Sequence, residues 1–164
     1  MNSENSPYVL PVDVILADKT ICNGTLHIWD TDDVDPAVGR LDLEFAGKMQ
    51  SSKGHSFFWV LREIRKVLDA EGILVRCYGC SRNVWPSSVS ASMGRGVKAY
   101  RYVLGQRSSR KDIVSIFASG PDTDPCTFRE QEEFHKLWLQ SVGITTGDAC
   151  WSAPPNRTRL RFEP

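Results

Sequence analysis

Two cysteines separated by two residues, in Cys77-Tyr78-Gly79-Cys80, have the spacing of pairs that ligate zinc or form a redox couple. A structural zinc site needs four ligands, and the sequence has no second cysteine pair and no histidine pair at ligand spacing. A redox couple usually opens a helix, whereas Cys77 falls in an expected strand, where the two side chains would point apart. We therefore predict two small buried side chains, no metal site and no cofactor.

A nucleophilic mechanism would use Cys80 or Ser81 with His55 or His135 as the general base. The histidines are scattered along the sequence. His55 precedes an expected helix and His135 lies within another, so we expect capping and surface roles for them. A small enzyme with a cysteine or serine nucleophile remains an alternative, but the sequence contains no complete catalytic set.

A short glycine-containing segment, Met93-Gly94-Arg95-Gly96, has some likeness to loops that bind phosphate. It precedes a strand and lacks the lysine-serine ending of such loops, so nucleotide binding is not expected. Basic and aromatic side chains follow this segment, at Lys98, Tyr100, Arg101, Tyr102, Arg107, Arg110 and Lys111. They leave a nucleic-acid-binding module as a third alternative, although a solvated surface face is favoured.

Charge is unevenly distributed along a chain whose formal net charge is zero. Residues 1–45 contain nine acidic and two basic side chains, and residues 46–112 contain thirteen basic and four acidic ones. Four of the acids are close together, at Asp30, Asp32, Asp33 and Asp35. This asymmetry either steers a charged partner or lets the two segments neutralise each other in the fold.

The first third of the chain shows the alternation of strands with one buried face. Residues 12–16, 25–30 and 41–45 predict three antiparallel strands, the first two joined through Asn23-Gly24. The segment 32–36 then forms an exposed acidic tip between the second and third strands.

Two later segments have the periodicity of amphipathic helices. The first begins at Ser56 and stops at Gly72, and the second covers residues 128–141. In the first helix we expect these residues to face away from the core: Arg62, Glu63, Arg65, Lys66 and Asp69. In the second we expect these to face inward: Phe134, Leu137 and Trp138.

Three further strands are predicted at residues 73–78, 97–104 and 112–117. The fold class is therefore α+β, with a mostly antiparallel sheet of five to six strands and two main helices. We expect one globular domain over residues 1–164, with a tail from about residue 143 that wraps over the surface.

The sequence contains no apolar run of about 18 residues, the length a membrane helix needs, and its start lacks the pattern of a signal peptide. The five cysteines, an odd number, favour reduced thiols. We expect a cytoplasmic protein that binds no membrane.

A long connection between two predicted strands runs from Cys80 to about Tyr100. It contains Arg82, Trp85 and Arg95, and aromatic residues and arginine dominate binding energy at protein interfaces. Long connections in compact domains usually have a function. This segment therefore indicates a recognition surface, or else a loop that packs on itself.

The same stretch carries a family resemblance. Tyr78-Gly79-Cys80-Ser81-Arg82-Asn83-Val84-Trp85-Pro86-Ser87 and then Met93-Gly94-Arg95-Gly96-Val97-Lys98-Ala99-Tyr100-Arg101 resemble small bacterial immunity proteins associated with polymorphic toxins of the Rhs type. The similarity covers roughly residues 55 to 140. Ser88-Val89 stand where the family has Gly-Met, so the turn there is expected to differ.

The resemblance implies a cytoplasmic protein that binds one cognate toxin, one to one, and occludes its active site or substrate path without a cofactor. Charge complementarity is the usual means of such recognition. Two surfaces are predicted for this contact. Their residues are Asp30, Asp32, Asp33 and Asp35 in the acidic tip, and Arg82, Trp85 and Arg95 in the long connection.

Overall fold

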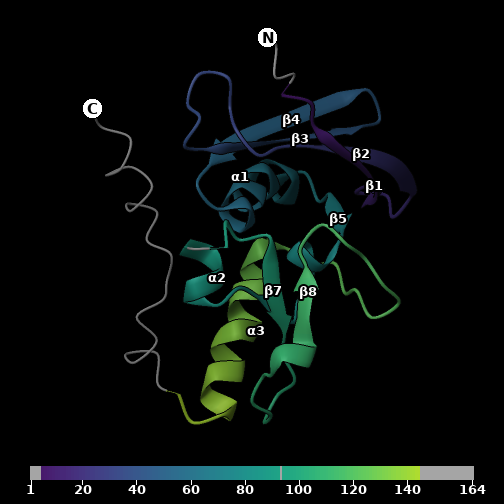
Figure 1. Ribbon diagram of the computed structural model, residues 1–164. Helices are drawn as coiled ribbons and strands as arrows, with labels where there is room; N and C mark the ends of the chain where they lie inside the picture. Colours follow the sequence, from purple (N-terminus) through teal and green to yellow (C-terminus); the bar gives the residue numbers. More distant parts are fainter. Residues whose placement is uncertain (1–4, 93, 145–164) are drawn as a thin grey trace.

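The computed structural model describes residues 5–92 and 94–144, and these form an α+β fold with two antiparallel sheets (Figure 1). The predicted fold class is confirmed. The strands are β1 (Tyr8–Ile15), β2 (Ile21–Trp29), β3 (Gly39–Phe45), β4 (Lys48–Gly54), β5 (Leu74–Arg76), β6 (Val84–Trp85), β7 (Lys98–Arg101) and β8 (Ile113–Ser115). The helices are α1 (Phe57–Ala70), α2 (Ser88–Ser92) and α3 (Phe128–Ser141), with short 3₁₀ turns at Tyr78–Cys80 and Arg110–Asp112.

The larger sheet has the strand order β4-β3-β2-β1-β5, and every neighbouring pair is antiparallel. Alternate residues of its central strands are apolar, so one face can be buried while the other meets water. Helix α1 packs against the buried face (Figure 1). The core side chains on this face are Val12, Val14, Leu26, Ile28, Leu41, Leu43 and Phe45.

The first hairpin turns several residues earlier than predicted. Gly24 lies within β2 opposite Val12, and the turn is formed by residues 16–20, with Lys19 at a φ of 71°. A Cβ on Gly24 would lie 2.9 Å from a methyl carbon of Val14. This glycine therefore serves close packing, and its use as a turn signal was wrong.

Strand β4 was not predicted, because its sequence is polar and Gly54 is its only buried residue. It is the edge strand of the sheet, and it pairs with β3 through a tight turn whose residues, Ala46 and Gly47, have φ of 46° and 74°. Edge strands often have charged side chains, such as Lys48 and Lys53 here, because these discourage pairing with another chain.

Helix α1 lies where the periodicity predicts it and ends as expected before Gly72, whose φ is 72°. Its start differs from the prediction, because the Ser56 side chain makes no capping bond. The carbonyl of Arg95 instead accepts a hydrogen bond from the Phe57 amide at 2.7 Å. Arg65 was expected to face solvent but is buried, with 3% of its surface exposed.

The smaller sheet, β6-β7-β8, packs with α3 and shares one core with the larger sheet. The predicted single connection up to Tyr100 is divided by β6 and α2. Helix α3 starts with a capping box between Thr127 and Glu130. Its Leu137 is 55% exposed, contrary to prediction, and the helix buries Gln131, His135, Trp138 and Leu139.

Within the described residues, no helix combines the length and apolar character needed to cross a membrane. The predicted surface tail falls, from residue 145 onward, outside the part of the chain that the structure describes.

Candidate functional site

The segment that joins β2 to β3, residues 30–38, is here termed the acidic loop. Its centre is Asp32, whose Oδ1 accepts hydrogen bonds from the backbone amides of Val34 and Asp35, both at 3.1 Å. The Asp32 amide in turn donates to the Val38 carbonyl at 2.9 Å. The Asp35 carboxylate accepts from the Ala37 amide at 3.0 Å. The loop is therefore folded by its own side chains.

Three residues from other elements hold the acidic loop in place. Arg95 donates to the Asp30 carbonyl and, at 3.3 Å, to the Ala37 carbonyl. His55 Nδ1 lies 3.1 Å from the same Ala37 oxygen. Asn5 donates to the Thr31 carbonyl at 2.7 Å and to the carboxylate of Asp33 at 3.2 Å. The loop is thus fixed before any partner arrives.

The four predicted aspartates have different positions. Asp30 and Asp33 are exposed and Asp35 is half-buried, whereas Asp32 is buried. The Asp35 backbone amide and then Lys53 hold the pKa of Asp32 below its ordinary value. Asp32 therefore positions the loop through its own bonds, and its predicted role as a partner contact stays a prediction.

The tip of the acidic loop also presents an apolar side chain. Val34 is 86% exposed, the largest value among the exposed large hydrophobic residues of the described chain. It lies between Asp33 and Asp35. An apolar residue bordered by carboxylates on a fixed loop combines a contact that gains from burial with charges that orient the approach.

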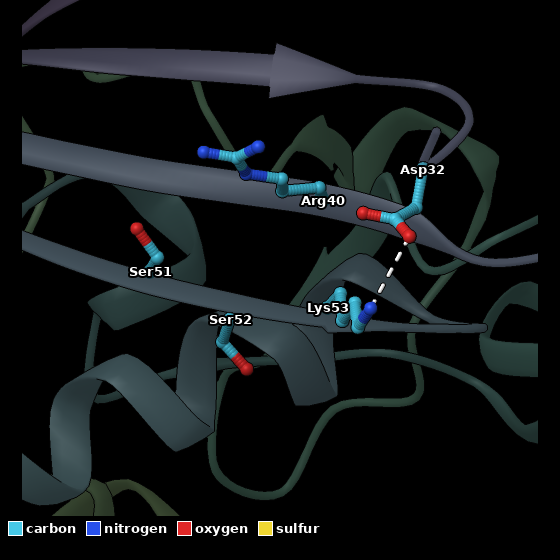
Figure 2. A pocket seen from close by; sticks show the side chains of 5 residues that line it. All are labelled: Asp32, Arg40, Ser51, Ser52 and Lys53. Atoms are coloured by element: carbon cyan, nitrogen blue, oxygen red, sulfur yellow. Dashed lines mark hydrogen bonds and ion pairs between the residues drawn. The ribbon is translucent and has the colours of Figure 1, made fainter. Parts of the chain in front are cut away.

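A shallow hollow of about 300 Å³ lies beside the loop, on the outer face of β3 and β4 (Figure 2). Lys53 crosses it to pair with Asp32 at 3.2 Å. Arg40 forms two hydrogen bonds with the buried carboxylate of Asp42, at 3.0 and 2.6 Å, and lies 4.6 Å from the ring centre of Trp29. Both cations that line the hollow are therefore already paired with acids, and the Lys53–Asp32 pair holds the acidic loop against β4.

Of the residues predicted in the long connection, Trp85 turns inward, whereas Arg82 and Arg95 are half-buried. Trp85 is 3% exposed, and its ring stacks on His135 at a centroid distance of 4.6 Å. Its predicted place on a recognition surface is wrong, because a buried ring offers nothing to a partner. Arg82 is half-buried and pairs with Asp124 at 3.0 Å and Glu130 at 3.7 Å, so it fastens the start of α3.

His135 is buried, contrary to the surface role expected for it. Burial lowers its pKa to about 4, because desolvation penalises the charged imidazolium. The ring is therefore neutral near pH 7, and it belongs to an aromatic cluster with Trp85, Tyr102 and Trp138.

The candidate nucleophiles are enclosed. Cys80 and Ser81 have no exposed surface, and burial raises the pKa of the Cys80 thiol well above its ordinary value. The Ser81 hydroxyl donates to Asn83 Oδ1 at 3.3 Å and accepts from the Asp124 amide at 2.9 Å. His55 lies instead at the acidic loop. These positions therefore do not assemble the predicted nucleophile and base pair with His55.

The cysteine pair was predicted to point apart, and this is wrong. Cys77 Sγ and Cys80 Sγ lie 3.6 Å from each other, because the chain leaves β5 and enters a 3₁₀ turn at Tyr78. Both side chains are fully buried. Within the described ranges, no three or more histidine, cysteine, aspartate or glutamate side chains are placed so that they could hold one metal ion.

The sequence analysis missed two buried polar residues, Gln131 and Arg65, that join α3 to α1 and to the Tyr78–Trp85 segment. Gln131 is completely buried and donates to the carbonyls of Gly79, Ser81 and Val84, at 3.1, 2.9 and 2.7 Å. Its Oε1 accepts from Arg65. Spacing could have revealed Arg65, since it lies four residues after Leu61 and three before Leu68, on the apolar stripe of α1.

No protein-family model and no curated protein matches this chain.

Within the described residues, the geometry separates two regions. The acidic loop is exposed and fixed. The segment from Tyr78 to Trp85 is buried and holds α1, α3 and both sheets together.

Proposed function

We propose that this chain is a cytoplasmic immunity protein that neutralises a cognate bacterial toxin by direct one-to-one binding and occlusion. The observation that carries the proposal is the acidic loop. It presents the carboxylates of Asp30 and Asp33 and the side chain of Val34 on a backbone fixed by Arg95, Asn5 and Asp32.

A fixed loop suits tight binding. Association loses conformational freedom, and a loop already held in its bound shape loses less of it. The exposed carboxylates would attract a basic cleft and raise the association rate, while Val34 would supply apolar contact once the loop is seated. A toxin that acts on a phosphate-containing substrate has a cleft of this charge, and a loop lodged in it would exclude the substrate.

The resemblance over roughly residues 55 to 140 agrees with this division of roles. Its motif residues Tyr78, Trp85 and Gly96 are buried, so we assign them to the scaffold. Arg95 links the acidic loop to α1, because its side chain anchors the loop and its carbonyl accepts a hydrogen bond from the first amide of the helix. We assign no catalytic residue and no contact with nucleic acid or membrane.

Survival of cells tests the proposal. The toxin encoded beside this chain's gene is expressed with the wild type, with D30N/D33N, and with E63Q/E133Q as the control. The control removes the same two charges from the exposed faces of α1 and α3. We expect the wild type and the control to protect, and the loop variant to protect poorly. Failure of the wild type to protect would overturn the proposal.

A further inference from the structure

Three buried cysteines gather where β5, α1 and α3 meet. Cys77 and Cys80 have no exposed surface and Cys126 has 2%. The 3₁₀ turn brings the first two together, since the Cys80 amide donates to the Cys77 carbonyl at 3.0 Å and the sulfurs lie 3.6 Å apart. Cys126 approaches the backbone of the same turn, with Sγ 3.7 Å from the Cys80 carbonyl.

A buried cation, Arg65, bonds to the backbone of the segments that contain these cysteines. Arg65 is 3% exposed, and its guanidinium donates to Gln131 Oε1, to the Cys126 carbonyl at 2.7 Å and to the Gly79 carbonyl at 3.4 Å. All three acceptors are neutral. Among the described residues, no carboxylate forms an ion pair with Arg65 within 4.0 Å.

Two acids of the adjoining helices, Asp69 and Glu130, bond to other groups. One carboxylate oxygen of Asp69 accepts from the Phe128 amide at 2.8 Å, and Glu130 completes the capping box of α3. A buried charge without a counter-charge is costly. A thiolate in this cluster would supply one.

We propose that Cys77 and Cys80 are a redox-active dithiol, in which Arg65 stabilises the Cys77 thiolate and a peroxide closes the pair to a disulfide. The thiol of Cys80 and then Arg65 lower the pKa of Cys77, whereas burial raises that of Cys80. In this proposal Cys77 is the attacking sulfur and Cys80 the resolving one.

The chemistry balances with hydrogen peroxide as the oxidant. The Cys77 thiolate attacks one peroxide oxygen, the O–O bond breaks, and the departing hydroxide takes a proton to become water. Cys80 then attacks the sulfenic sulfur of Cys77 and displaces a second water, which carries away the Cys80 proton. Two thiols are oxidised to one disulfide and the peroxide is reduced to two waters.

Closure needs only a small movement. The sulfurs must approach from 3.6 Å to about 2.05 Å, which rotation of the two side chains can supply. The Gly79 carbonyl accepts a hydrogen bond from the Gln131 side chain, and the Cys80 carbonyl accepts one from the Cys126 amide. Neither bond involves the sulfurs. The disulfide form is therefore expected to keep the fold and to unfold at a higher temperature.

Peptide mapping of the full-length chain tests this. The reduced protein is treated with hydrogen peroxide without denaturant, its remaining thiols are blocked, and it is digested. We expect a Cys77–Cys80 linkage, the loss of two free thiols, and the same loss in C22S, which removes a half-buried cysteine outside the cluster. No linkage, linkage to Cys126, or oxidation only in denaturant would overturn the proposal.

The role of Arg65 is tested by the rate of oxidation. For R65Q we expect about a tenfold slower reaction at pH 7 for each unit by which the pKa of Cys77 rises. Because R65Q removes a buried group and can impair folding, the pH profile of the wild type provides a second test. A rate that levels off below the ordinary thiol pKa of about 8.5 supports the proposal, and one that rises past it contradicts the role of Arg65.

Discussion

The acidic loop and the Tyr78–Trp85 segment both contain charged and aromatic residues, yet the fold uses them in opposite ways. In the loop, Asp33 and Val34 are exposed, while Asn5 and Arg95 hold the loop backbone by hydrogen bonds to its carbonyls. The segment turns Trp85 inward and gives its carbonyls to Gln131. Residue type alone does not mark an interface, since aromatic residues serve cores as readily. The two regions should therefore respond differently to substitution.

Loss of the Trp85 ring is expected to have the largest effect. W85A removes a buried aromatic side chain that contacts Phe58 and His135, and it should lower the free energy of unfolding by about 4 kcal/mol. The matched change at the loop tip, V34A, should stay within about 0.5 kcal/mol of the wild type. Urea unfolding measures both. Equal free energies of unfolding for W85A and V34A would contradict the assignment of Trp85 to the core and of Val34 to the surface.

Gln131 should follow. Q131L removes one of the acceptors of Arg65 and the side-chain donor to three buried carbonyls, of which Gly79 keeps its bond from Arg65 and Ser81 its bond from the Val84 amide. About 3 kcal/mol of unfolding free energy should be lost. The exposed Gln140 on the same helix offers the control Q140L, with little expected change. Unfolding of both variants at the same urea concentration would contradict the role of Gln131 in joining α3 to Arg65 and the Tyr78–Trp85 segment.

A smaller and pH-dependent effect is expected from His135. Its pKa is about 4 in the folded chain and about 6.5 when unfolded, so the unfolded chain binds more protons between these values. The contribution of a neutral His135 is complete above pH 6.5 and declines as the pH falls, by about 2 kcal/mol at pH 5. The stability difference between wild type and H135F should shrink or reverse accordingly from pH 8 to pH 5. A difference constant with pH would contradict burial of this ring.

A small change in stability is expected for Arg95, which joins the acidic loop to the start of α1. R95M removes two bonds to loop carbonyls, and it should cost about 1 kcal/mol or less. Its main effect should be faster hydrogen exchange at the amides of Asp32 and Val38, which bond within the loop. K98M, an exposed change on β7, is the control. Unchanged exchange in R95M would show that Arg95 does not order the loop.

Local patterns in the sequence account for much of the fold. The alternation around Leu41 and Leu43 and the stripe from Phe57 to Leu68 predicted β3 and α1, because each pattern has the period of its element. Strand β4 escaped prediction because an edge strand can be polar. Arg65 and Gln131 escaped because polar residues are buried only where tertiary partners satisfy them, and those partners are distant in sequence.

The candidate site was only partly predictable. The four aspartates marked the acidic loop, but which of them turns inward depends on Lys53 and on the loop's own amides. The cysteine pair was misplaced because a strand was extended through Tyr78, where the backbone makes a 3₁₀ turn instead. Arg95 was singled out for an interface, and its role as an anchor depends on contacts 58 and 65 residues away in the sequence.

We propose that the acidic loop, and not the Tyr78–Trp85 segment, contacts the toxin. Isothermal titration of the cognate toxin domain with D30N/D33N and with E63Q/E133Q tests it most directly. We predict an affinity at least about tenfold weaker for the loop variant and within about twofold of the wild type for the control, at equal stability. Wild-type affinity in D30N/D33N would contradict the claim.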